Sequence, residues 1–399
     1  MFEPLESVAR AAFADRFVGE PTAMGLAPGR VELLGNHTDY NGGLVLAAAI
    51  NRFTVVVGRS VGGRTARVLS VHFDELDTFS VDTIEPGEAG SWKRYVRGVA
   101  WTLQERSGPL ASGFEAALVG NVPLGTGLSS SASLEAAFAM FLRQVGQGGA
   151  NDLDDLSRME LAHALRRAEN AFVGVASGLL DQFSSLFGRA EQALLLDCRS
   201  LEFDRLPMGQ PAPAIVVCDS KTSRRLADGM YNQRRDECNR VVDHFQKRRG
   251  IESVQSLRDL TIEDLQADWH DLDPVGRRRA RHVLTENARV RQGAEALRIG
   301  DVAELGRWMS ASHVSSRDDF ENSSKALDDL IEIAETAPGH LGGKLSGAGW
   351  AGCTVHLVVP DQAEAFADAM RTGSTRRTGT EPVIHVCKAA GGATGRSFT

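Results

Sequence analysis

The chain of 399 residues lacks an apolar run of about 20 residues, the length that a helix needs to cross a bilayer. Its start is acidic and lacks the basic segment of a secretory signal. Positive charge is also scarce, with 44 Lys and Arg against 52 Asp and Glu and a formal net charge of −8. Even the densest basic run, 277–282, is interpreted best as a solvated helix start paired with nearby acids. We therefore expect a cytoplasmic protein that binds neither a membrane nor nucleic acid, although one nucleotide remains possible.

Cysteine is sparse as well. The five cysteines are odd in number and scattered, and none has the C-x-x-C spacing of redox and zinc motifs. They predict reduced thiols, and neither a disulfide framework nor a zinc site. Hydrophobic residues nevertheless make up 42% of the chain, which is enough to bury a core and argues against general disorder.

The length favours two domains, and near Pro211 the sequence changes from strand-like runs with glycine turns to mainly helical patterns. We place the boundary near residue 205, which gives domains 1–205 and 206–399. The first alternates strand-like runs with glycine turns, and its expected elements are strands at 43–50, 53–59, 114–119 and 193–197 and helices at 129–145 and 155–173. The second is expected to contain a strand at 214–218, helices at 224–247, 280–298, 301–312 and 325–336, and a strand, helix and strand at 353–359, 361–370 and 382–387.

Glycine and serine gather at 125–133, between an expected strand and an amphipathic helix. Glycine lets a backbone approach a ligand closely, and the N–H groups at a helix start attract anions. Three consecutive serines form helices poorly, so a phosphate-binding loop explains this segment better than a capped turn. A second glycine cluster, 347–352, formally matches G-x-G-x-x-G. The strand expected after it, and the lack of a convincing strand before it, argue against a dinucleotide-binding fold.

A third cluster, 30–43, packs Arg30, His37, Asp39 and several amides into one segment. This density of donors and acceptors suits a polyhydroxylated ligand, although an Asx-rich turn would have the same composition. Asp181 stands among apolar residues. It is either a half-buried carboxylate paired with a cation such as Arg30, or a helix-capping residue.

Segments 29–43, 123–133 and 345–353 resemble the signature motifs of galactokinases, which are sugar kinases of the GHMP family, and they occur in the order of that family. Similarity at 168–183, 231–235, 279–289 and 313–321 extends the resemblance over nearly the whole chain. It implies an α+β fold of two domains with the active site between them. The N-terminal domain would be like ribosomal protein S5, with a left-handed β-α-β unit, and the C-terminal domain ferredoxin-like.

The resemblance also implies an activity, the transfer of the γ-phosphoryl group of ATP to the anomeric C1 hydroxyl of galactose. Mg²⁺ is the implied cofactor. The expected partners are a small-molecule sugar and ATP, and we expect a monomer or a weak homodimer.

Roles carry over from the resemblance position by position. Asp181 falls on the catalytic aspartate, which acts as base or charge stabiliser toward the C1 hydroxyl, and Arg30 falls on its paired arginine. Ser131 and Glu169 fall on the Mg²⁺ ligands, both oxygen donors. The expected sugar contacts are Asn36, His37, Thr38, Asp39, Gly178 and Tyr231. The expected ATP contacts are Ser70, Trp92, Gly125, Thr126, Gly127, Leu128, Ser129, Ser130 and Ser131.

Asn36 departs from the family pattern. Galactokinases usually carry Glu there, and its carboxylate accepts a hydrogen bond from the C6 hydroxyl of the sugar. Asn can still bind a hydroxyl, and it would not repel a C6 carboxylate. Galactose is therefore the expected substrate, with galacturonate or another C6 variant as the alternative. A non-catalytic sugar and ATP sensor is a further alternative, against which the complete serine loop and the presence of Asp181, Arg30 and Glu169 argue.

Overall fold

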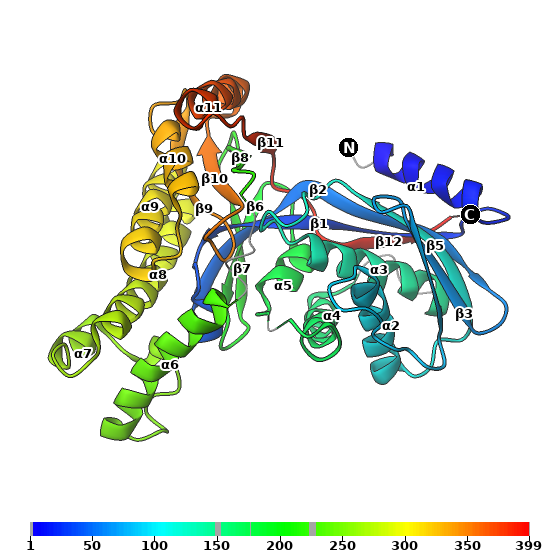
Figure 1. The fold of residues 1–399 in the computed structure, drawn as a ribbon, viewed down its shortest axis with the longest axis horizontal. Coiled ribbons are helices and arrows are strands. Elements are labelled where there is room, and N and C mark those ends of the chain that lie inside the picture. Colours follow the sequence, from blue (N-terminus) through cyan, green and yellow to red (C-terminus); the bar gives the residue numbers. More distant parts are fainter. Residues whose placement is uncertain (1–2, 148–152, 176, 223–228, 399) are drawn as a thin grey trace.

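The computed structural model describes all residues except 1–2, 148–152, 176, 223–228 and 399, and contains two sheets with helices on their faces (Figure 1). The larger sheet consists of β1 (Ala23–Leu34), β2 (Leu44–Val61), β3 (Thr65–Ser70), β4 (Glu75–Ser80), β5 (Gly113–Gly120), β6 (Gln192–Asp197), β7 (Phe203–Pro207) and β12 (Thr394–Ser397). Its order is β12-β1-β2-β5-β3-β4, and β6 pairs with both β2 and β7. The smaller sheet has the order β11-β8-β10-β9, from β8 (Ala214–Asp219), β9 (His340–Leu345), β10 (Cys353–Val358) and β11 (Val383–Cys387).

Helices cover both sheets (Figure 1). Those of the N-terminal half are α1 (Glu3–Arg16), α2 (Lys93–Ser107), α3 (Ser130–Gln147), α4 (Asp155–Arg167) and α5 (Leu180–Phe187). Those of the C-terminal half are α6 (Met230–Arg249), α7 (Ile262–Ala267), α8 (Pro274–Arg298), α9 (Val302–Ser315), α10 (Lys325–Ala334) and α11 (Ala363–Thr378). None of the helices in the described ranges has the length and apolar character needed to span a bilayer.

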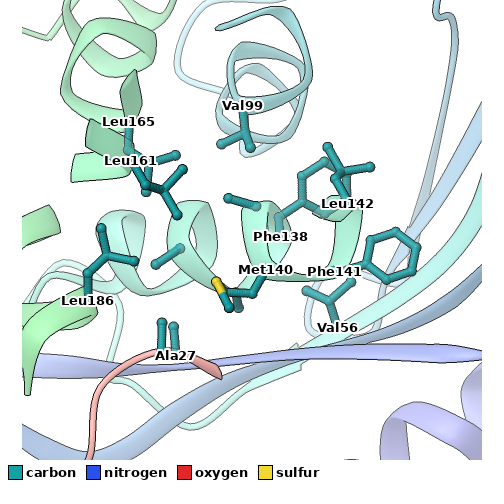
Figure 2. Close-up of a cluster of buried hydrophobic side chains, with 14 of the residues drawn as sticks. Ala27, Val56, Val99, Phe138, Met140, Phe141, Leu142, Leu161, Leu165 and Leu186 are labelled. Carbon is teal, nitrogen blue, oxygen red and sulfur yellow. The ribbon is translucent and has the colours of Figure 1, made fainter. Parts of the chain in front are cut away.

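Alternating side chains of the larger sheet serve two cores. In β2, Val56 packs toward α3 in the cluster that Figure 2 shows, whereas Val55 and Val57 pack with α1 on the other face. Helix α3 supplies Phe138 and Phe141 to the first cluster, and both rings are fully buried. Strand β1 lies between these layers, and all twelve of its residues are buried.

A third core joins the two sheets. Leu33 and Leu46 of the larger sheet belong to one cluster with Ile215 and Val355 of the smaller sheet, and with Met309 of α9. The chain also returns at its end to the larger sheet, because β12 pairs with β1. The domain boundary near residue 205, which falls within β7, stays a prediction.

Several expected elements have different limits in the structure. The strands expected at 43–50 and 53–59 are one strand, β2, and the helix expected at 155–173 ends as a π-helical turn, Ala168–Val173. The segment before the 347–352 glycines, which we considered too short and glycine-rich, does form strand β9. Because β9 and β10 are antiparallel neighbours, the glycines close a hairpin and no dinucleotide-binding unit arises. Residues 224–228 of the helix expected at 224–247 lie outside the described residues.

The basic run at 277–282 pairs with acids, as expected, but it is not a solvated surface, because Arg279 and His282 are buried. Arg278 and Arg279 both form ion pairs with Glu321, and Arg281 pairs with Asp319. Arg279 also contacts Glu237 at 2.6 Å and is only 2% exposed. These contacts make the run part of the packing between α8 and its neighbours.

Gly25 sets how closely α3 approaches β1, and its replacement tests that packing. A Cβ atom there would lie 1.9 Å from the Ala137 carbonyl oxygen, a backbone atom of α3. We expect Gly25→Ala to lower the free energy of unfolding by about 1–3 kcal/mol, measured by urea denaturation. Gly62→Ala is the control, because nothing lies within 4 Å of its added Cβ, and its effect should stay within about 0.5 kcal/mol. Equal stability of the two variants would contradict this view of the layer.

Candidate active site

Three loops meet beside the end of β1. We call residues 35–43 the sugar loop, 123–129 the phosphate loop and 346–352 the glycine loop. The Arg30 N–H donates to the Leu128 carbonyl at 3.1 Å, which joins β1 to the phosphate loop. The Asn36 side chain donates to the Gly347 carbonyl at 2.8 Å, which joins the sugar loop to the glycine loop. The Cys353 thiol, which follows the glycine loop, donates to the Thr126 carbonyl at 2.9 Å.

The phosphate loop has the backbone that its sequence suggests. Gly125, Gly127 and Ser129 all adopt positive φ, at 71°, 86° and 56°, immediately before α3 begins at Ser130. Thr126 donates its hydroxyl to the Pro123 carbonyl at 3.0 Å, which closes the turn. The Ser129 hydroxyl is buried and has no hydrogen-bond partner within the described part of the chain. A phosphate oxygen would satisfy that hydroxyl and the N–H groups at the start of the helix.

Arg30 connects Asp181 to the phosphate loop. Its Nε and Nη2 atoms donate to Asp181 Oδ1 at 2.8 and 2.5 Å, and its Nη1 donates to the Gly127 carbonyl at 2.5 Å. The Arg30 side chain is 7% exposed and the Asp181 side chain 29%. Asp181 therefore lies in the first turn of α5 with one side open, held in place by a buried cation.

Glu169 and Ser131 lie together. Glu169 belongs to the π-helical turn that follows α4, and its Oε1 accepts a hydrogen bond from the Ser131 hydroxyl at 3.1 Å. Its Oε2 accepts from the Ser177 hydroxyl and from Gln182 Nε2, the latter at 2.8 Å. Burial raises the pKa of Glu169, and the charge of Asp181 acts in the same direction. A bound cation would offset both effects.

This donor set fits Mg²⁺. A carboxylate and a hydroxyl next to a phosphate loop are the hard oxygen ligands that Mg²⁺ takes, with nucleotide phosphates and water completing its shell. The described residues hold no group of three or more His, Cys, Asp or Glu side chains that would form a metal site without the nucleotide.

Two residues behind Glu169 were not predicted from the sequence. Gln182 donates to Glu169 and, at 3.1 Å, to Glu135, and both Gln182 and Glu135 are fully buried. Burial raises the pKa of Glu135 well above its usual value. The only available signal was the helical spacing of Ser131 and Glu135, which puts both on one face of α3.

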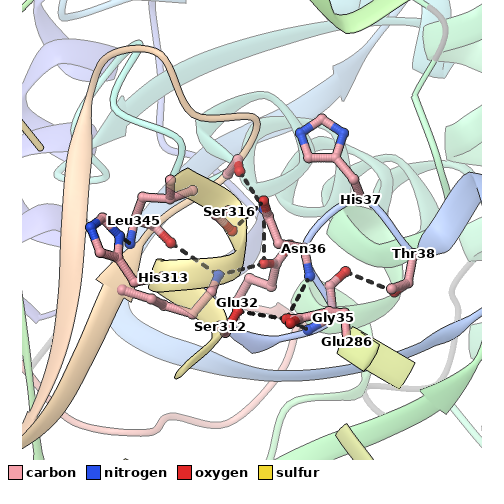
Figure 3. Close-up of polar contacts among 12 residues, drawn as sticks. Glu32, Gly35, Asn36, His37, Thr38, Glu286, Ser312, His313, Ser316 and Leu345 are labelled. Carbon is pink, nitrogen blue, oxygen red and sulfur yellow. Dashed lines mark hydrogen bonds and ion pairs between the residues drawn. The ribbon is translucent and has the colours of Figure 1, made fainter. Parts of the chain in front are cut away.

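Most polar side chains of the sugar loop already form hydrogen bonds with other groups of the protein (Figure 3). Asn36 is 1% exposed and contacts Glu32, Gly347 and Asn322, while Thr38 donates to the Gly35 and Leu44 carbonyls. His37 is 4% exposed, with its two ring nitrogens 2.9 Å from the Tyr40 hydroxyl and 3.0 Å from the Ala348 carbonyl. These three predicted sugar contacts therefore already have partners in the protein.

Asp39 and its neighbours are more available. The side chain of Asp39 packs against Gly178, where an added Cβ would lie 2.1 Å from Asp39 Oδ2. Burial raises the pKa of Asp39 to about 6, and the charges of Glu32 and Asp181 add to the shift. The Tyr231 ring lies 5.3 Å from His37 and 5.4 Å from Tyr40, between centroids. The structure thus gathers Asp39 with Gly178, and the charge of Asp181 acts on both Asp39 and Tyr231.

The predicted nucleotide contacts outside the phosphate loop lie near the β3–β4 hairpin. Ser70 ends β3 next to Leu118 of β5, the strand that leads into the phosphate loop, and its buried hydroxyl has no partner among the described residues. Trp92 donates its Nε1 to Glu75 at 3.1 Å. Its ring is parallel to that of Phe73, with centroids 6.4 Å apart. Phe73 is 47% exposed, so this pair presents aromatic surface to solvent.

The ion pair between Lys344 and Glu32, next to the sugar loop, was also not predicted from the sequence. Lys344 is fully buried, and its Nζ lies 2.7 Å from Glu32 Oε1. Glu286 accepts hydrogen bonds from the Gly35 and Asn36 N–H groups at 2.9 and 3.2 Å. A lysine within an apolar strand needs a buried acid, but the sequence does not indicate which acid.

Three family models match the chain. They are the galactokinase galactose-binding signature at 11–60, the GHMP kinases N terminal domain at 94–189 and the GHMP kinases C terminal at 294–374. A curated galactokinase from a Roseiflexus species is 42% identical over 383 residues, 96% of this chain and 95% of that protein. One from Actinobacillus succinogenes is 38% identical over 392 residues, 97% and 98% of the two chains.

Solved structures agree with these matches. The crystal structure of Lactococcus lactis galactokinase complexed with galactose is similar with a TM-score of 0.90 and 32% identity, covering 98% of this chain and 99% of that one. A mevalonate kinase structure, at a TM-score of 0.63 and 16% identity over 92% of this chain and 98% of that one, shares the fold.

His282 allows a pH test of the packing under the sugar loop. It is fully buried, with Nε2 3.0 Å from the Asn36 carbonyl and Nδ1 2.9 Å from the Ser315 hydroxyl, and burial lowers its pKa to about 4. In the unfolded chain the imidazole becomes protonated near pH 6.5, whereas in the folded protein it stays neutral until the pH falls to about 4. Stability is therefore complete above pH 6.5 and should fall toward pH 4, by about 1.4 kcal/mol per pH unit for one such group.

We expect urea denaturation of His282→Gln to give a shallower pH dependence between pH 6.5 and 4 than the unsubstituted protein gives. His37 and His340, whose pKa values burial lowers to about 3 and about 4, keep part of the slope in both. An unchanged slope in the variant would mean that His282 is not held neutral.

Proposed function

The chain belongs to the galactokinases of the GHMP kinase family, and we propose how its own residues phosphorylate galactose with ATP. The observation that carries the proposal is the contact of Arg30 with both Asp181 and the Gly127 carbonyl. It places a half-exposed carboxylate beside a loop suited to phosphates, with a buried cation between them. This is the arrangement that phosphoryl transfer to a sugar hydroxyl needs.

In the proposed step, the C1 hydroxyl oxygen of galactose attacks the γ-phosphorus of ATP. The bond between that phosphorus and the bridging oxygen of ADP breaks, and ADP leaves with the electron pair. The hydroxyl proton passes to the Asp181 carboxylate. Arg30 holds that carboxylate in place through two hydrogen bonds and stabilises negative charge as it develops.

We assign Ser131 and Glu169 to Mg²⁺, on the strength of their 3.1 Å contact beside the phosphate loop. The ion supplies charge neutralisation on the ATP phosphates when it is bound. The phosphate loop, with Ser130 and Ser131 at the start of α3, binds those phosphates through its N–H groups and serines. Ser70 and Trp92 complete the proposed nucleotide site.

For the sugar, Asp39, Gly178 and Tyr231 are the proposed contacts, and galactose is the substrate. Galacturonate is less well supported, because the Asn36 amide group that would meet its carboxylate already donates to Glu32 and Gly347. A non-catalytic sensor is also less well supported, because the positioned Arg30 and Asp181 pair would then have no task. We further propose a cytoplasmic monomer or weak homodimer, and the five thiols of the chain fit a reducing compartment.

Replacement of Asp181 tests the mechanism. We expect Asp181→Ala to lower kcat for galactose by about 10²–10⁴-fold, because the positioned proton acceptor is lost. ADP release with galactose and Mg-ATP measures the loss, and calorimetry checks that ATP still binds. Turnover close to that of the unsubstituted enzyme would exclude Asp181 as the proton acceptor.

The titration of Asp39 predicts a pH dependence of sugar binding. A charged carboxylate accepts sugar hydroxyls more strongly than a protonated one does. Since the pKa of Asp39 is raised to about 6, we expect the Kd for galactose to increase as the pH falls below about 6. Calorimetric titrations from pH 7.5 to 5 measure this. Asp39→Asn should bind more weakly and without that pH dependence, and a parallel dependence in the variant would assign it to another group.

A further inference from the structure

Asn36 has no hydrogen-bonding capacity left for a ligand. Its Nδ2 donates to Glu32 Oε1 at 3.2 Å and to the Gly347 carbonyl at 2.8 Å. Its Oδ1 accepts from Asn322 Nδ2 at 2.8 Å and from the Ser316 hydroxyl at 3.4 Å. A side-chain amide has two donors and two acceptor sites, so all four are used. With 1% of its surface exposed, Asn36 could meet a sugar hydroxyl only by giving up a protein partner.

Asn322 is the key partner of Asn36. It is fully buried, and its Nδ2 donates both to Asn36 and to the Ala348 carbonyl at 3.0 Å. The backbone carbonyl of Asn322 accepts a hydrogen bond from the backbone N–H of Trp350 at 2.6 Å. Asn322 therefore holds the glycine loop at two points and the sugar loop at one.

The ion pair below makes the arrangement rigid. Glu32 Oε1 accepts from both Asn36 and the fully buried Lys344, so its charge is balanced within the protein. Moving Asn36 toward a ligand would break its bonds to Glu32 and to Gly347 together. Buried polar groups left without partners are costly, so the amide stays where it is.

The glycine loop in turn positions His37. The Ala348 carbonyl that Asn322 holds also contacts His37 Nε2 at 3.0 Å. The His37 ring lies 5.3 Å from Tyr231 and 5.9 Å from Trp350, between centroids. A displaced glycine loop would therefore release the aromatic side of the proposed sugar site.

We propose that Asn36 and Asn322 form a tie between the sugar loop and the glycine loop, and that Asn36 is a positioning residue which does not contact the C6 hydroxyl of the sugar. The proposal rests on the proposed function for the place of the sugar. It differs from the direct sugar contact that the family resemblance led us to expect at this position. Loss of the tie weakens the binding of any galactose-configured sugar, whether or not that sugar carries a C6 hydroxyl.

The test compares galactose with 6-deoxygalactose by titration calorimetry, which does not depend on turnover. We expect Asn36→Ala to raise the Kd of both sugars by roughly tenfold, with the ratio of the two Kd values unchanged within about twofold. Asn322→Ala, which removes the partner and leaves Asn36 in place, should reproduce both results. Asn239→Ala, at an exposed site in α6, is the matched control and should change neither Kd.

A direct contact predicts the opposite pattern. Asn36→Ala would then weaken galactose alone, and the Kd ratio would fall toward one. That result, or an Asn322→Ala variant that binds galactose normally, would overturn the tie. If Asn36→Ala does not fold, Asn322→Ala decides alone. ADP release by the unsubstituted enzyme is measured separately, and its absence would count against the proposed function while the Kd ratios still test the tie.

Kinetics separate positioning from general damage. A tie that orders the sugar site should raise KM for galactose while kcat changes by less than about threefold, since Arg30 and Asp181 are untouched. An equal fall of kcat for both sugars with unchanged KM would contradict the proposal.

Discussion

The buried guanidinium of Arg30 is the group on which the rest of the site depends. A cation in the interior is tolerated only when its donors have partners, and Arg30 finds them in Asp181 and the Gly127 carbonyl. Those partners belong to α5 and the phosphate loop, so satisfying one side chain brings β1, α5 and the start of α3 into register. The same contacts that stabilise the fold set the distance between the carboxylate and the phosphate-binding loop.

Around Arg30, the site concentrates negative charge in a dry environment. Arg30 balances Asp181, and Lys344 balances Glu32. Burial instead raises the pKa of Asp39 and Glu169. Sugar hydroxyls at Asp39 and a metal ion at Glu169 would relieve that desolvation. The proposed function therefore links ligand binding to fold stability through these two carboxylates.

Much of this arrangement could be predicted from local patterns. The glycines and serines of the phosphate loop precede an amphipathic helix, and the structure has that helix with positive φ at Gly125 and Gly127. The local pattern left two interpretations of Asp181, a carboxylate paired with Arg30 or a helix cap, and the family resemblance favoured the pairing that the structure shows. Strand β9 was wrongly discounted, since two glycines weaken strand propensity but pairing with β10 stabilises the strand. Gln182, Lys344 and Asn322 were not found, because the partners that make them informative are 13 to 312 positions away in the chain.

The sequence by itself determined the family and the class of reaction, because the motifs of glycines, serines and carboxylates are legible in local order. It also predicted the groups that we propose to carry the reaction. Only the tertiary structure decided which of those groups remain available to a ligand. The sequence shows that Asn36 carries an amide that could bind a sugar hydroxyl. The structure shows that neighbouring protein groups already take both of its donors and both of its acceptor sites. Hydrogen-bond saturation belongs to the packed state, because partners distant in sequence become neighbours only when the two sheets share one core.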